Sequence, residues 1–196
     1  MMQTIFRAAN SLLALCLLAL MPQMAHSQAA APAKPAPGTP LQPSQELDRI
    51  LSGIEKQLVP LAEAMPEEKF EFVPSGPGSD FKGVNSFAKH VKHLTEANDY
   101  YFADPPMSQA EFKAKEEAIE KLTSKADILQ AFKDSFKQAH AYVAGITPEN
   151  AWLALPSGRS RASLAAYTMQ HMMDHYGQMV VYLRMNGIVP PASRPK

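Results

Sequence analysis

Four long stretches of the chain carry apolar residues every three or four positions, the spacing that places them on one face of an α-helix. These stretches span about residues 44–65, 86–103, 124–145 and 161–186. Pro66 ends the first stretch, Pro105 follows the second, and Gly187 provides a C-terminal cap for the fourth. No stretch shows the strict alternation of apolar and polar residues that is typical of a strand. The sequence therefore predicts an all-α fold, and four amphipathic helices joined by loops favour an antiparallel four-helix bundle.

The apolar positions of the first three helices predict which side chains form the core. In the first helix they are Leu47, Ile50, Leu51, Ile54, Leu58 and Leu61. In the second they are Phe87, Val91, Leu94, Asn98 and Tyr101, and in the third Ile128, Phe132, Phe136 and Val143. The charged residues 108–122 are predicted to form a short surface helix with few core residues, and residues 151–161 a loop.

Residues 1–27 have the three parts of a secretory signal peptide. Arg7 gives a weakly positive start, residues 11–21 are an apolar run, and residues 25–27 form a small-x-small cleavage sequence. The apolar run is shorter than the about 20 residues that a transmembrane helix needs. We therefore expect cleavage before Gln28, export to the periplasm or the medium, and no stable membrane insertion of the mature chain.

Composition limits what the remaining chain can do. Residues 28–43 are rich in Ala and Pro and predict a disordered tether, so the folded domain is expected at residues 44–193. Cys16 is the only cysteine and lies in the predicted signal, so the mature chain has neither a disulfide nor a thiol nucleophile. The 19 basic and 19 acidic residues balance, which argues against a nucleic-acid-binding protein with a basic face.

The fourth helix carries polar side chains where a bundle core would normally be apolar. Its inward stripe is predicted to be Leu164, Tyr167, His171, His175, Gln178 and Tyr182. His171 and His175 are four residues apart, so they lie on one face and two imidazoles can hold one metal ion. The sequence lacks the Glu that follows the first His in the HExxH motif, because Met172 stands there, which excludes a thermolysin-like peptidase.

The second helix offers a third imidazole from His90 or His93, and periodicity does not choose between them. Three His ligands leave a position open for water or substrate, as in catalytic rather than structural zinc sites. Such a ligand set accepts zinc, nickel, iron or manganese without sharp selection.

Four segments carry a resemblance to a known family. They are residues 65–72 (MPEEKFEF), residues 86–98 (SFAKHVKHLTEAN), the His-x-x-x-His pair at 171–175 and residues 176–191 (YGQMVVYLRMNGIVPP). Over about residues 44–193 the chain resembles the DinB-like superfamily, also called the YfiT-like metal-dependent hydrolase group. The resemblance implies a four-helix bundle with a metal held by His93, His171 and His175, and it favours His93 over His90.

The resemblance also implies hypotheses about function. The group includes metal-dependent thiol transferases and isomerases that use bacillithiol or mycothiol, although an exported chain has less access to cytosolic thiols. The first hypothesis is an exported hydrolase or transferase for a small-molecule substrate, in which the metal lowers the pKa of a bound water or thiol. The second is a non-catalytic metal-binding or stress-related bundle, and a third is a bundle that forms a homodimer or binds a partner through its outer helix faces. An open pocket with converging polar groups beside the metal distinguishes the first from the second.

Residues near the histidines have simpler interpretations. Asp174 is expected on a solvated face, with the orienting of an imidazole as the alternative role. Glu96 is also expected on a solvated face, with a general base as the alternative role. Gln178 is expected either to contact a metal-bound water or to form a hydrogen bond within the core, and His140 to be structural or exposed. The methionines of the fourth helix are expected to pack rather than to bind copper, and they are Met169, Met172, Met173 and Met179.

Overall fold

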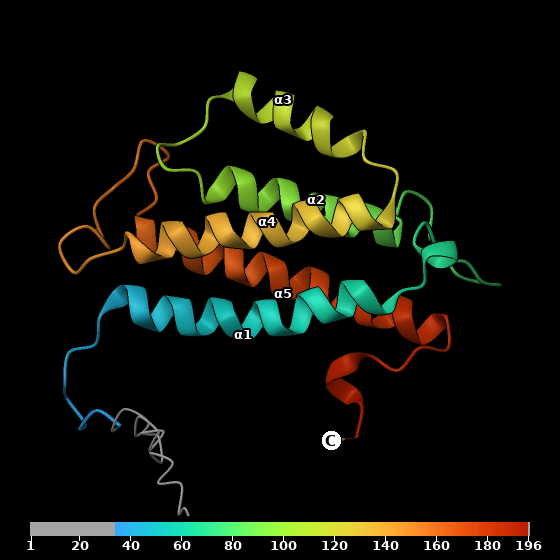
Figure 1. The fold of residues 1–196 in the computed structure, drawn as a ribbon, viewed down its shortest axis with the longest axis horizontal. Helices are drawn as coiled ribbons and strands as arrows, with labels where there is room; N and C mark the ends of the chain where they lie inside the picture. The colour runs from blue at the N-terminus through green and yellow to red at the C-terminus, as the bar shows by residue number, and fades with distance from the viewer. Residues whose placement is uncertain (1–33, 196) are drawn as a thin grey trace, which may run out of the picture. The chain divides into compact units, whose positions relative to one another are not determined.

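The computed structural model describes residues 34–195 and confirms an all-α fold (Figure 1). Its helices are α1 (Pro43–Ala64), α2 (Phe87–Tyr101), α3 (Gln109–Glu120), α4 (Lys125–Ala144) and α5 (Arg161–Met185), with short 3-10 turns at Glu67–Lys69 and Pro191–Ser193. An isolated bridge between Ala154 and Ser160 is the only strand-like pairing within the described residues. The predicted signal peptide and residues 28–33 of the predicted tether lie outside the described residues. Among residues 34–195, no helix combines the length and the apolar character needed to cross a bilayer.

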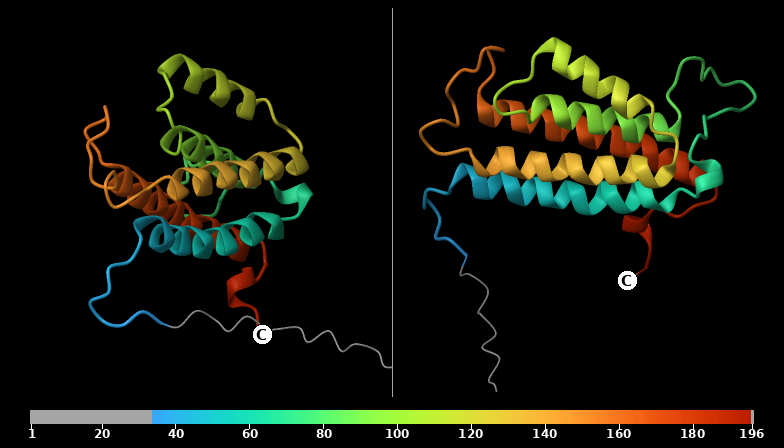
Figure 2. Two further views of the ribbon diagram at one scale, coloured as in Figure 1. Left: turned by 60° about the vertical axis from the view of Figure 1, so that its left-hand side comes forward. Right: turned by 45° about the horizontal axis from the view of Figure 1, so that its top comes forward.

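Four of the helices close into a ring around one core. α1 packs against α4 and α5, and α2 packs against the same two helices from the opposite side. α3 lies outside this ring and packs on α2, as both further views show (Figure 2). The described residues thus form a four-helix bundle with one additional helix on its surface.

The helix directions differ in part from the antiparallel arrangement that the sequence predicts. α1 and α5 run in the same direction, and α2 and α4 run together in the opposite direction (Figure 1). Accordingly, Phe102 after α2 packs on Tyr142 near the end of α4, whereas Lys125 at the start of α4 donates a hydrogen bond to the Glu63 carbonyl near the end of α1. The reason is α3, which returns the chain along the outside of the bundle so that α4 starts beside the start of α2.

Local sequence explains where the helices begin and end. The side chains of Ser86, Ser124 and Ser160 each accept a hydrogen bond from the first turn of the helix that follows. At the end of α5, Gly187 has a φ of +73°, and the amides of Gly187 and Ile188 donate to carbonyls of the last turn. This is a Schellman cap, and its left-handed residue favours glycine, as the sequence predicts.

The predicted core positions are mostly buried. Leu51, Leu58 and Leu61 of α1 are fully buried, as are the four predicted residues of α4, namely Ile128, Phe132, Phe136 and Val143. Asn98 is also buried, and its amide nitrogen donates a hydrogen bond to the hydroxyl of Ser135 on α4. Leu47 and Tyr101 are partly buried. Ile50 is 48% exposed, and the prediction that it belongs to the core is wrong.

Candidate metal centre

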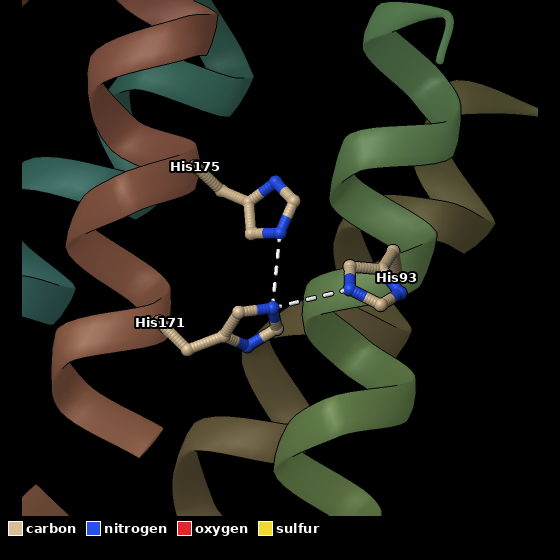
Figure 3. Close-up of side chains that lie close together, drawn as sticks. All are labelled: His93, His171 and His175. Atoms are coloured by element: carbon tan, nitrogen blue, oxygen red, sulfur yellow. Dashed lines mark hydrogen bonds between the residues drawn. The ribbon is translucent and has the colours of Figure 1, made fainter. Parts of the chain in front are cut away.

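Three histidines from two helices bring their ring nitrogens together halfway along the bundle (Figure 3). His93 projects from α2, and His171 and His175 project from α5. The Nε2 atom of His171 lies 3.2 Å from Nε2 of His93 and 3.0 Å from Nε2 of His175. All three candidate ligand atoms lie within 4.8 Å of one another. The structure thus brings together the three residues that the family resemblance implies.

The helix geometry explains this convergence. His171 and His175 are one turn apart on α5, so both rings leave the same face of that helix. α2 runs antiparallel to α5, and contacts along this interface bring Tyr101 against Tyr167 at one end and Asn85 against Tyr182 at the other. His93 lies between these two contacts and therefore meets the pair.

The distances fit a single metal ion. Two imidazole nitrogens that each lie about 2.0–2.1 Å from a metal, at tetrahedral or octahedral angles, are about 2.8–3.4 Å apart. The two measured separations of 3.0 and 3.2 Å fall within that interval. Both pairs that include His171 are therefore at the spacing of two ligands of one ion, and the third pair lies within 4.8 Å.

The proton count supports the same interpretation. Nε2 of His171 contacts two other ring nitrogens, but a neutral imidazole nitrogen offers either one proton or one lone pair, not both. Hydrogen bonds among neutral rings would therefore crowd two donors onto one lone pair or divide one proton between two lone pairs. A cation accepts all three lone pairs at once, so the donor set fits a metal better than a hydrogen-bonded cluster.

The rings are held in the neutral form that a metal needs. Burial, together with the neighbouring histidines, lowers the pKa of His175 to about 4. Burial also lowers the pKa of His171, and burial with the nearby His171 and Lys89 lowers that of His93. All three shifts thus favour the neutral imidazole.

His90 lies behind the cluster rather than in it. Its Nδ1 is 2.9 Å from Nδ1 of His175, which is the ring nitrogen that faces away from the other ligands. His90 is buried, its ring packs edge-on against Tyr182, and burial lowers its pKa to about 4. A group that accepts the proton of Nδ1 fixes the orientation of a ligating imidazole. The structure therefore separates the two histidines of α2 that periodicity left equivalent.

Glu96 does not lie on a solvated face, so that prediction is wrong. Only 4% of Glu96 is exposed, and its carboxylate lies 3.9 Å from Nδ1 of His93 and 3.9 Å from Nζ of Lys89. Burial, helped by the neighbouring Glu120, raises its pKa to about 7. α3 causes this burial by packing on α2, which the charged sequence of α3 does not predict. The spacing of three residues between His93 and Glu96 places them on one helix face and could have indicated the proximity.

A cavity of about 360 Å³ adjoins the histidines between α2, α3 and α5. Its walls include His93, Glu96, Tyr101, Phe112 and His171. The cavity therefore combines two candidate ligands, a buried carboxyl group and aromatic surfaces, which is the composition typical of a small-molecule site.

The other predicted residues lie outside the site. Gln178 is exposed and donates to the exposed Asp174 at 3.1 Å, so the predicted contact of Gln178 with a metal-bound water or the core is wrong, and Asp174 is solvated as expected. His140 is structural, because it joins α4 to Asp48 and Glu55 of α1. The methionines pack as predicted, with Met169, Met172 and Met179 buried and Met173 partly buried.

Comparison with known proteins agrees with this geometry. The sequence model of the DinB superfamily matches residues 50–179, a range that contains all three clustered histidines and His90. No curated protein matches the chain significantly.

Proposed function

The chain belongs to the DinB superfamily, and from this membership we propose that it binds one divalent metal ion through His93, His171 and His175. The observation that carries the proposal is the convergence of three neutral imidazole nitrogens at ligand spacing. Zinc, nickel, iron and manganese all accept such a ligand set.

We propose further that the site is catalytic and acts on a small molecule by hydrolysis or group transfer. A divalent ion in a three-His site supplies Lewis acidity and lowers the pKa of a bound water or thiol. Within the cavity, the buried carboxyl of Glu96 is placed to hold or release a proton, and the rings of Tyr101 and Phe112 supply aromatic surface for a substrate.

The polar side chains in the cavity wall favour this function over a purely structural metal site. A structural site has four protein ligands and a closed collar. Here the cluster offers three histidines and adjoins an open cavity that also contains Glu96, Gln109 and Glu116.

We also propose that the protein is exported after removal of residues 1–27. The support is the order of a basic residue, an apolar run and a small-x-small sequence before Gln28. Expression in a bacterial host, followed by fractionation and N-terminal sequencing, tests this proposal, and an intact N-terminus in the cytoplasm would refute it.

Elemental analysis of the purified domain tests the metal site. We expect close to one equivalent of one metal in the wild type, and loss of that metal in His171→Ala. The matched control is His140→Gln, which removes a histidine that lies between α4 and α1 and keeps the cluster intact. Far-UV circular dichroism verifies that each variant is folded. A wild type that stays free of metal after incubation with zinc, nickel, iron and manganese would refute the proposal.

A further inference from the structure

A second cavity lies at the end of the bundle where α2 and α4 end and α5 begins. Its volume is about 270 Å³, and its walls include the loops after α2 and before α5. Tyr100 and Tyr101 line both this cavity and the one beside the histidines. The two cavities are therefore neighbours on either side of these two tyrosines.

The wall of the second cavity carries one uncompensated positive charge. Arg161 forms a two-pronged ion pair with Asp104, with N–O distances of 2.7 and 3.1 Å, so these two charges offset each other. Arg159 also lines the cavity and has no ion-pair partner within residues 34–195. Its guanidinium lies 4.2 Å from the ring centroid of Tyr167, and this cation–π contact holds the charge in place.

The same cavity is lined by a buried polar group that has no hydrogen-bond partner among the described residues. Tyr142 is 4% exposed, and its hydroxyl has no hydrogen-bond partner among the described residues. A buried donor without a partner is unfavourable, and a ligand with an acceptor atom removes that cost. Met107, Leu155 and Pro156 supply apolar walls. An anion with an apolar body would pair with Arg159, accept a hydrogen bond from Tyr142 and pack against these apolar residues.

We propose that this cavity binds the carboxylate end of a small organic acid with an apolar or aromatic body. A single uncompensated guanidinium matches the single charge of a carboxylate better than the double charge of a phosphate monoester. The further step, that this acid is the substrate presented to the histidine cluster, rests on the function proposed above. Binding of the acid by Arg159 does not depend on it.

Calorimetric titration with 3-phenylpropionate and its neutral analogue 3-phenylpropionamide tests the charge requirement. We expect the acid to bind the wild type at least tenfold more tightly than the amide, a difference of about 1.4 kcal/mol. Arg159→Gln is expected to abolish this preference. The matched control is Arg49→Gln, which loses the same charge on α1, where Arg49 pairs with Glu46. Equal affinity for acid and amide in the wild type, or no binding of either, would overturn the proposal.

Two further variants separate the cavity from the metal centre. Tyr142→Phe is expected to weaken binding of the acid at least tenfold, the effect of losing one hydrogen bond to a charged acceptor. His171→Ala is expected to leave it within twofold of the wild type, even if the metal proposal fails. Binding that is lost in His171→Ala and unchanged in Arg159→Gln would show that the acid binds at the histidine cluster, and the proposal would be wrong.

Discussion

His140 makes the stability of the bundle depend on pH in a direction that the structure determines. Its Nδ1 lies 2.5 Å from Asp48 and its Nε2 lies 3.1 Å from Glu55, both on α1. Two carboxylates offer only acceptors, so both ring nitrogens donate only when His140 is protonated. Burial by itself lowers the pKa of His140, but the two hydrogen bonds and the charges of Asp48 and Glu55 outweigh burial and raise it above 6.5.

The size of this contribution follows from the exposure of the three side chains. A hydrogen bond to a charged group contributes about 1.5–3 kcal/mol when it is protected from water. The side chains of His140, Asp48 and Glu55 are 27%, 49% and 36% exposed, so solvent screening reduces the sum to about 1–2 kcal/mol. Because the folded pKa is raised, this stabilisation is complete below the unfolded pKa of about 6.5 and is lost as pH rises through the folded pKa.

Urea denaturation of the metal-free wild type and His140→Gln at pH 5.5 and pH 9 measures this effect. We expect the variant to lose about 1–2 kcal/mol of unfolding free energy at pH 5.5 and well under 1 kcal/mol at pH 9. The clustered histidines contribute equally to the unfolding free energy of both proteins, so their contribution cancels when the two free energies are subtracted. Lys137→Gln is the matched control, because Lys137 forms an exposed pair with Asp134 on the same helix and should lose about 0.5 kcal/mol or less at both pH values. An equal loss at both pH values, or a larger one at pH 9, would show that His140 is not held as a cation.

Two other substitutions test the site and the core. His90→Phe should keep the fold but weaken metal binding about 10–100-fold, because Nδ1 of His175 loses its partner. Competition with a chromophoric chelator measures the metal affinity, and an unchanged affinity would contradict the role of His90. Phe132→Ala should cost about 3–5 kcal/mol in chemical denaturation, since Phe132 is fully buried against Phe136 in the core; a loss below about 1 kcal/mol would mean that the site collapses around the smaller side chain.

The helices could be predicted from sequence because their causes are local. Apolar spacing, the serine caps and the glycine at position 187 each act within a few residues, and all of them occur in the structure. The relative direction of the helices depends instead on α3. α2 and α4 run parallel because α3 packs on α2 from outside the ring. This parallel direction depends on a contact between helices, so no short stretch of sequence predicts it.

The candidate site divides in the same way. His171 and His175 could be paired from their spacing alone, because a helix fixes their relation. His93 and His90 could not be separated by periodicity, since both flank the apolar stripe of α2 and only the packing against α5 distinguishes them. The burial of Glu96 could not be predicted for a related reason, because α3 buries a charged position that α2 by itself would leave in water.

The three clustered histidines differ in how far apart they lie along the chain. His171 and His175 are four residues apart, whereas His93 precedes His171 by 78 residues. A helix formed early around the pair would already offer two ligands, so a divalent ion would have affinity for partly folded chains as well as for the native bundle. A ligand that binds both states stabilises the native one only by the ratio of its affinities. The ion would thus contribute to folding stability mainly through His93, the one ligand on α2. Its effect would be to slow the separation of α2 from α5 rather than to increase helix content.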